Sequence, residues 1–121
     1  MKRTAISVVL SVAIGLATPV ATATDPLSRL TIETPKTYAK RLTEGRWPGS
    51  WACLHELWHR ESRWKHTADN PRSSAYGIPQ ILGLSPELNP YQQVDRGLDY
   101  IAHRHSSPCR ALRFHDRKGF Y

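Results

Sequence analysis

Residues 51–62 read WACLHELWHRES and contain the clearest helical pattern in the chain. Large apolar side chains recur there at three- and four-residue spacing, which places them on one face of a helix. That face holds Trp51, Leu54, Leu57, Trp58 and Glu61. Ser50 is a favourable N-cap, and we expect the helix to end between Ser62 and Trp64. Glu61 is therefore expected at the C-terminal end of an apolar helix face.

The rest of the chain predicts short helices joined by loops. Residues 35–42 form a first helix with Pro35 in its opening turn, and glycines and a proline at 45–49 end it. Residues 67–80 are rich in turn-forming residues and are expected to form a loop. A helix is expected from Asn89-Pro90 to His105, and a last short helix and tail over 109–121. Strand patterns are weak, so we predict a mainly α-helical fold in one small domain, residues 36–121.

The first 23 residues have the layout of a secretory signal peptide. Lys2 and Arg3 precede an uncharged, largely apolar run at 4–16, and Ala21 and Ala23 are the small residues of a cleavage site. The alternative is an uncleaved membrane anchor, for which the run is short. Residues 24–35 are expected to form a flexible arm. These features predict a secreted or cell-envelope protein without stable membrane insertion after cleavage.

Export changes the interpretation of the two cysteines, Cys53 and Cys109. In an oxidising compartment a pair of cysteines indicates a disulfide rather than a metal or redox site. Such a bond would close a loop of more than fifty residues, which corresponds to about 4 kcal/mol in the chain-entropy model. The alternative is two unpaired buried thiols.

The chain is basic, with a formal charge of +7, and removal of Lys2 and Arg3 leaves +5. A basic exported protein favours polyanionic partners. Nucleic acid and bacterial cell wall both meet that description, and export favours the wall. We therefore expect a monomer that binds peptidoglycan strands and no nucleic acid.

Glu61 is the candidate for chemistry. Partial burial on the apolar face and the negative end of the helix dipole both raise the pKa of a carboxyl group. A raised pKa keeps an acid protonated near neutral pH, as general acid catalysis at a glycosidic oxygen requires. The alternative is a surface glutamate paired with Arg63 or Lys65.

The order Glu61, Ser62 and Trp64, followed by SAYGIPQ at residues 74–80, resembles the signature of soluble lytic transglycosylases and goose-type lysozymes. That signature pairs a glutamate–serine at a helix end with a G-A-x-G-L-x-Q loop. Here Ser74 replaces the first glycine and Ile78 the leucine. Residues 89–101 are similar to the family's next helix, and residues 107–121 to the tail of its actinobacterial and phage members. The resemblance covers residues 36–121.

This resemblance implies a lysozyme-like fold and a glutamate that acts alone, without a cofactor or metal. It implies cleavage of the β-1,4 bond between N-acetylmuramic acid and N-acetylglucosamine, with formation of 1,6-anhydromuramic acid. Ser62 and Gln80 are then expected to bind substrate or hold the site, and Tyr76 and Tyr100 to line the sugar cleft. Structural roles for these four residues remain open. We expect Gly77 to be required for the backbone conformation at its position.

A hydrolytic inverting route would need a second carboxylate across the sugar. Asp69, Asp95 and Asp99 are the nearby candidates, and no spacing favours any of them. Asp95 and Asp99 are four residues apart, as on a solvated helix surface.

The sequence departs from the family in two places. The span from Gln80 to Asn89 is short, which predicts a trimmed cleft wall. The family's Y-N-A-G-type motif, whose tyrosine points at the glutamate, has no clear match. His103 and Tyr121 are the candidates to replace that tyrosine.

Two other functions stay open. His55-Glu56-Leu57-Trp58-His59 matches the H-E-x-x-H pattern of zinc peptidases, which would need a third ligand downstream. Solvated helix histidines are the alternative explanation of that pattern. The chain could also be a wall-binding domain of the same fold that does not catalyse.

Overall fold

The structure is a computed structural model that describes residues 11–15 and 31–121. The chain divides into two units, Met1–Thr31 and Ile32–Tyr121. In the first unit, residues 11–15 form neither helix nor strand and are exposed. Most of the predicted signal peptide and most of the predicted arm lie outside the described residues. Within the described ranges, no helix is both long and apolar enough to cross a bilayer.

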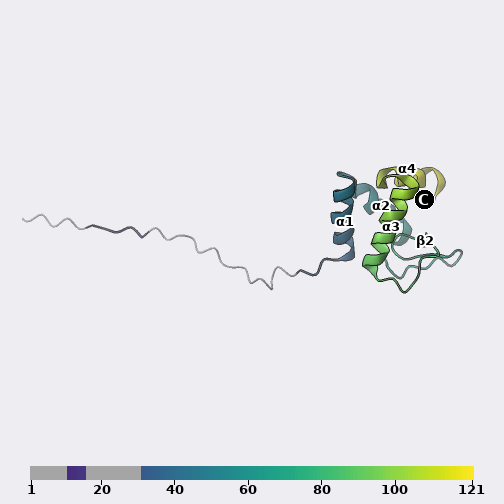
Figure 1. Ribbon diagram of the computed structural model, residues 1–121, viewed down its shortest axis with the longest axis horizontal. Coiled ribbons are helices and arrows are strands. Elements are labelled where there is room, and N and C mark those ends of the chain that lie inside the picture. The colour runs from purple at the N-terminus through teal and green to yellow at the C-terminus, as the bar shows by residue number, and fades with distance from the viewer. Residues whose placement is uncertain (1–10, 16–30) are drawn as a thin grey trace, which may run out of the picture. The chain divides into compact units, whose positions relative to one another are not determined.

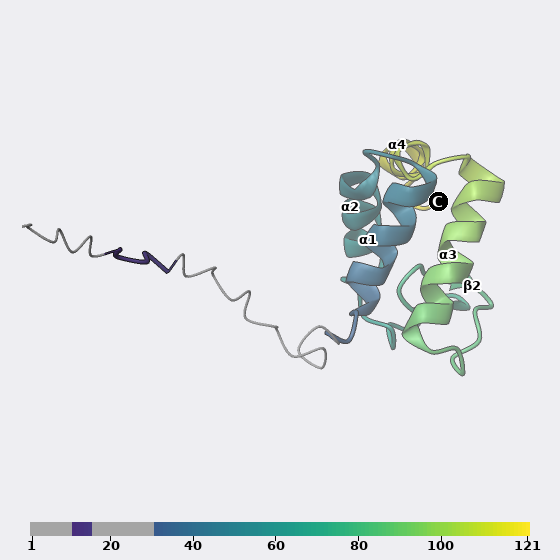
Figure 2. The same cartoon turned by 60° about the vertical axis from the view of Figure 1, so that its left-hand side comes forward.

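The second unit is mainly helical, which confirms the predicted class (Figure 1). Its elements, in chain order, are α1 (Pro35–Arg46), α2 (Trp51–Ser62), β1 (Ala75–Tyr76), β2 (Ile81–Leu82), α3 (Pro90–His105) and α4 (Pro108–Lys118). Helices α1 and α3 lie side by side, and α4 packs against α2 and α3 (Figure 2). The two short strands pair antiparallel, with Ala75 opposite Leu82.

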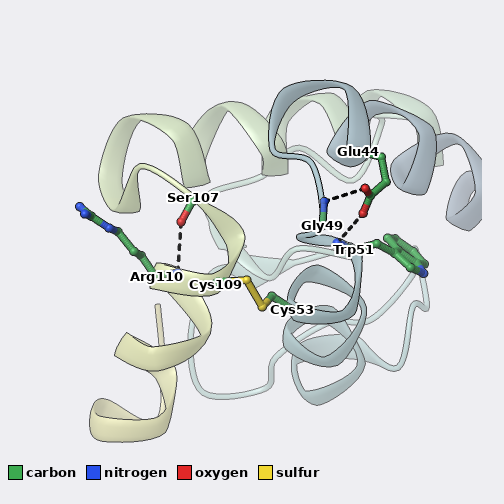
Figure 3. The surroundings of a disulfide bond; sticks show 7 residues. All are labelled: Glu44, Gly49, Trp51, Cys53, Ser107, Cys109 and Arg110. Carbon is green, nitrogen blue, oxygen red and sulfur yellow. Dashed lines mark hydrogen bonds between the residues drawn. A yellow bond between two sulfur atoms is a disulfide. The ribbon is translucent and has the colours of Figure 1, made fainter.

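Most helices are capped by the side chain of their own N-cap residue, and α2 is the exception. Asn89 and Gln92 form a capping box at the start of α3. Ser50 is the N-cap residue of α2, as predicted, but its side chain makes no capping hydrogen bond. The carboxylate of Glu44 accepts from the backbone N–H groups of Gly49 and Trp51, at 2.8 and 2.9 Å (Figure 3). A residue of α1 therefore satisfies donors at the start of α2.

Helix α1 continues through Gly45 and ends at Arg46, within the 45–49 stretch that was predicted to end it. Gly45 does not stop it, although glycine costs a helix interior about 1 kcal/mol. Thr43 in this last turn is buried, and its hydroxyl donates to the Ala39 carbonyl at 2.7 Å. Packing of this turn offsets the poor local propensity of glycine.

The hydrophobic core forms around Trp58, which is fully buried. It is built by the inner faces of all four helices, one loop residue and the tail. These are Ala39, Leu54, Leu57, Ile78, Val94, Leu98, Ile101, Ala111 and Tyr121. Gly97 lets α3 approach the Trp58 indole, because a Cβ there would lie 2.5 Å from Trp58 Cζ2 and 2.8 Å from Pro79 Cβ. The apolar face predicted for residues 51–62 is thus the centre of the fold.

The predicted disulfide is present between Cys53 and Cys109, across a sequence separation of 56 (Figure 3). It joins the first turn of α2 to the first turn of α4. Further along both helices, Arg60 donates to the carboxylate of Asp116. The two helices therefore run in the same general direction away from the disulfide, and their C-terminal ends lie together.

The loop between α2 and α3 is held by Gln93, which is 1% exposed. Its side-chain oxygen accepts from the Ile78 N–H at 2.9 Å, and its amide nitrogen donates to the His66 carbonyl at 2.9 Å. Gly77 has a φ of 76° and sits against this side chain, in agreement with its predicted conformational role. One buried amide on α3 thus fixes the loop that carries SAYGIPQ.

Candidate active site

A cavity of about 340 Å³ opens at the C-terminal end of α2. Four segments distant in sequence build it: the end of α2, the loop and hairpin at 70–82, the last turns of α3, and the tail after α4. The lining residues are Glu61, Asn70, Ser73, Ala75, Gln80, Leu82, Tyr100, Arg104, Gly119, Phe120 and Tyr121. Glu61 is the acidic residue among those that line this cavity.

The Glu61 side chain is only 16% exposed. Burial raises the pKa of its carboxyl group to about 7, so the acid keeps its proton to a much higher pH than an ordinary glutamate. The partner of the carboxyl is neither Arg63 nor Lys65. It is His115 of α4, whose Nε2 lies 3.1 Å from Glu61 Oε1. Glu61 is therefore a desolvated carboxyl at a cavity wall, the setting that a general acid requires.

The backbone just after Glu61 is unusual. Arg63 and Trp64 both adopt positive φ, of 52° and 62°, a region that bulky residues rarely occupy. Trp64 then folds back on α2, with its ring centroid 5.3 Å from that of Trp58. Its indole N–H donates to the His55 carbonyl at 3.3 Å. Such backbone conformations cluster at functional sites, where the surrounding structure holds them in place.

Tyr121 lies at the cavity next to Glu61, whereas His103 is exposed on α3 and does not line it. The Tyr121 hydroxyl accepts from the Trp58 indole N–H at 3.0 Å and donates to the Pro79 carbonyl at 2.6 Å. Burial raises the pKa of this phenol well above its usual value, and the nearby Glu61 adds to the effect. Of the two candidates for the missing tyrosine, Tyr121 is the one that lines the cavity together with Glu61.

The opposite wall combines a tyrosine with a cation. Tyr100 donates its hydroxyl hydrogen to the main-chain oxygen of Tyr121 at 3.0 Å. The Arg104 guanidinium lies 5.9 Å from the centre of the Tyr100 ring. Leu82 and Phe120 line the same cavity and are 71% and 54% exposed. The cavity thus offers apolar and aromatic surface together with a few polar groups, as ligand sites do.

The other residues predicted to bind substrate have different positions. Gln80 lines the cavity, but its amide nitrogen donates to the carbonyls of Ala68 and Gly77, both at 2.9 Å. The Ser62 hydroxyl is buried and donates to the Ile78 carbonyl at 2.7 Å. Tyr76 lies in β1, outside the cavity lining. Gln80 and Ser62 therefore hold the loop in place, and Tyr100 is the predicted tyrosine that faces the cavity.

None of the three aspartates considered as a second carboxylate lines the Glu61 cavity. Asp95 accepts from the Tyr38 hydroxyl at 2.8 Å, and Asp99 pairs with Arg46 at 3.3 Å. Both residues are exposed, as predicted for a solvated helix surface, and both bond to residues of α1. Asp69 forms an isolated β-bridge with Tyr76.

The histidines of the H-E-x-x-H pattern lie on the outer face of α2. The rings of His55 and His59 are stacked, with centroids 6.5 Å apart. Glu56 accepts from Arg60, four residues later on the helix surface, at 2.9 Å. In residues 11–15 and 31–121, no group of three or more His, Cys, Asp or Glu side chains could hold a metal ion. The third ligand of a zinc site is thus not found in this part of the chain.

Three residues of the site were not predicted from the sequence: His115, Arg104 and Phe120. Tyr121 was predicted only as a candidate to replace the family's tyrosine. One signal could have found His115. Pro108, Ala111 and His115 recur at helical spacing, and the first two are buried. The disulfide ties the starts of α2 and α4 together, so a residue six positions after Cys109 approaches one eight positions after Cys53.

Comparison of the chain with known proteins finds no matching family model, no matching curated protein and no matching solved structure.

Proposed function

We propose that this protein is an exported, lysozyme-like lytic transglycosylase that cleaves the glycan strands of bacterial peptidoglycan, with Glu61 as acid and then base. The observation that carries the proposal is a single buried carboxyl group at the wall of a cavity. Its burial raises its pKa to about 7, which suits a group that must first donate a proton and then accept one. The ordered resemblance of residues 61–80 to such enzymes supports the same assignment.

Glu61 performs both proton transfers. The carboxyl donates its proton to the glycosidic oxygen that joins C1 of N-acetylmuramic acid to C4 of N-acetylglucosamine. The C1–O bond breaks, and the glucosamine leaves with a new hydroxyl group. The Glu61 carboxylate then removes the proton from the muramic 6-hydroxyl, and O6 bonds to C1. The products are a 1,6-anhydro sugar and a regenerated carboxyl group, and no water is consumed.

The absence of a partner carboxylate from the cavity lining favours this route over hydrolysis. Inverting enzymes place a second carboxylate about 6.5–9.5 Å away to activate water, and retaining enzymes place one about 5–5.5 Å away as nucleophile. Glu61 is the acidic residue among the described residues that line the cavity. An internal hydroxyl of the substrate supplies the nucleophile instead.

The surroundings of the cavity fit a long anionic substrate. A second cavity of about 540 Å³ shares Leu82 and Tyr100 with the first, so the two are adjacent. Arg96 and Asp99 line the second cavity, so its charged groups are of both signs, and Arg104 lines the first. Cations along such a groove attract a strand that carries lactyl and peptide carboxylates. The predicted net positive charge acts in the same direction.

Mass spectrometry of digests of purified peptidoglycan tests the proposal. The wild-type protein is expected to release 1,6-anhydro-muropeptides, and Glu61→Gln to release none. The zinc peptidase hypothesis requires stoichiometric zinc in the purified protein and cleavage of peptide bonds. No feature of the described site favours it.

A further inference from the structure

The proposed mechanism gives no role to His115, the group closest to the acid. Its Nε2 lies 3.1 Å from Glu61 Oε1, and its side chain is only 15% exposed. Ordinary surface pairs between long side chains are exposed and contribute little. Here two titratable groups from different helices meet at hydrogen-bonding distance with little water around them.

The position of His115 is fixed independently of Glu61. The Cys53–Cys109 disulfide joins the two helices at their starts, and the Arg60–Asp116 pair joins them one residue away from the Glu61–His115 contact. His115 also lies on the face of α4 that carries the buried Ala111. The imidazole is therefore held against the carboxyl by the packing of α2 and α4.

We propose that His115 is a positioning residue: its imidazole, with Nε2 3.1 Å from Glu61 Oε1, orients the carboxyl toward the cavity and donates a hydrogen bond to the carboxylate that forms when the proton leaves. This inference rests on the proposed role of Glu61 as the acid. It assigns the acid proton to the other oxygen, Oε2. A fixed donor aimed at a developing charge in a desolvated site needs no reorganisation during the reaction.

The neutral imidazole is the form that this role requires. Burial lowers the pKa of His115, and the positive charge of Arg60 lowers it further, whereas Asp116 raises it. A neutral imidazole donates from one ring nitrogen only, so the Nε2–H tautomer is the one that faces Glu61. The charged and titratable groups around the pair are Arg60 on α2, Asp116 on α4, Tyr100 and Arg104 on α3, and Tyr121 in the tail.

Burial and a hydrogen bond from His115 have opposite effects on the pKa of Glu61. Burial alone raises the pKa of its carboxyl to about 7. A hydrogen bond to the charged form lowers a carboxyl pKa. Loss of the donor is therefore expected to raise the Glu61 pKa further and to weaken the acid. The KM for glycan is not expected to change, because His115 does not line the cavity.

The test compares the titration of Glu61 in four full-length proteins: wild type, His115→Leu, His115→Gln and His103→Leu. Carboxyl and imidazole NMR signals are followed against pH, and the pH dependence of wall cleavage is measured beside them. The leucine variant removes the donor, and the glutamine variant keeps an N–H donor of similar reach. His103 is an exposed histidine of α3 and serves as the matched control.

In His115→Leu we expect the Glu61 pKa and the alkaline limb of the rate profile to rise by about one pH unit, with lower kcat and unchanged KM. His115→Gln restores most of the shift, and His103→Leu leaves both unchanged. In the wild type, the His115 signal shows an inflection at the Glu61 pKa, because adjacent sites titrate together. The wild-type readout requires no substitution and therefore remains informative if His115→Leu fails to fold.

The inference is overturned if the Glu61 titration is the same with and without the imidazole. It is also overturned if the wild-type His115 signal shows no inflection at the Glu61 pKa. Failure of the proposed function gives a different result. In that case the wild type cleaves no peptidoglycan, while the NMR titrations still report whether His115 sets the pKa of Glu61.

Discussion

The Trp58 indole N–H donates to the hydroxyl oxygen of Tyr121, 63 residues further along the chain, at 3.0 Å. Both side chains are buried, and the same hydroxyl donates to the Pro79 carbonyl. One phenol thus joins the central helix, the SAYGIPQ loop and the tail at the wall of the cavity. The tail is in this way part of the site.

Tyr121→Phe is expected to destabilise the protein by about 2 kcal/mol, because it leaves a buried donor and a buried acceptor unpaired. Denaturant unfolding monitored by tryptophan fluorescence measures the change. Tyr76→Phe is the control, since the Tyr76 hydroxyl makes no hydrogen bond to the described residues, and we expect it to change the free energy of unfolding by under about 0.5 kcal/mol. Equal effects of the two substitutions would contradict the account of Tyr121.

Glu61→Gln is expected to stabilise the protein in alkaline solution. The folded state holds the Glu61 proton up to a pKa of about 7, against a reference value of 4.5. Folded protein therefore binds more protons between those values, and the wild type loses stability as pH rises through this window. At full ionisation the cost is about 3 kcal/mol, and the glutamine variant avoids it.

Urea unfolding at several pH values measures this difference. The stabilisation by Glu61→Gln should be largest above pH 8, a pH about one unit above the Glu61 pKa, and should shrink toward pH 4. The control is Glu56→Gln, whose carboxyl pKa is lowered by the hydrogen bond from Arg60. A stability difference for Glu61→Gln that stays constant with pH would show that burial does not raise the pKa of this group.

Removal of the disulfide by Cys53→Ala with Cys109→Ala is expected to cost about 4 kcal/mol, the chain-entropy value for a loop of this length. It should also loosen the ends of α2 and α4. Hydrogen exchange of both helices and thermal unfolding report the two effects. If the reduced protein unfolds at the temperature of the oxidised one, the crosslink does not contribute to the stability of the pair.

Gly97→Ala tests the close approach of α3 to Trp58. A methyl group there meets the indole and Pro79 at less than 3 Å, so we expect a loss of about 1–3 kcal/mol from overpacking. Gly45→Ala is the matched control, because nothing lies within 4 Å of its Cβ position in α1. That change should stabilise the protein by about 0.5–1 kcal/mol. If both variants changed the free energy of unfolding in the same direction, the close packing of Gly97 against Trp58 would be contradicted.

The sequence predicted the helices and the disulfide well because both depend on local patterns. The apolar spacing at 51–62 and the cap at Asn89-Pro90 gave α2 and α3 with their bounds. The group that caps α2 was not predicted, because it is a carboxylate from α1, that of Glu44. No pattern within residues 47–52 contains that information.

The site was predictable only in part for the same reason. Glu61 stood out because burial on a helix face and helix-end position are both visible in one segment. Three further residues come from elsewhere in the chain: Arg104 from α3, His115 from α4 and Tyr121 from the tail. Only tertiary packing brings them to the glutamate. The substrate roles expected for Ser62 and Gln80 came from a motif, whereas their hydrogen bonds go to carbonyls of the 68–78 loop.

The most direct test of the central claim is the product analysis of peptidoglycan incubated with wild type, Glu61→Gln and Glu56→Gln. Glu56 lies on the same helix but on its outer face, paired with Arg60, so its variant controls for the loss of a carboxylate. We predict 1,6-anhydro-muropeptides from the wild type and from Glu56→Gln, and none from Glu61→Gln. Products with reducing ends, or anhydro products that persist in Glu61→Gln, would contradict the claim that Glu61 alone serves as acid and base.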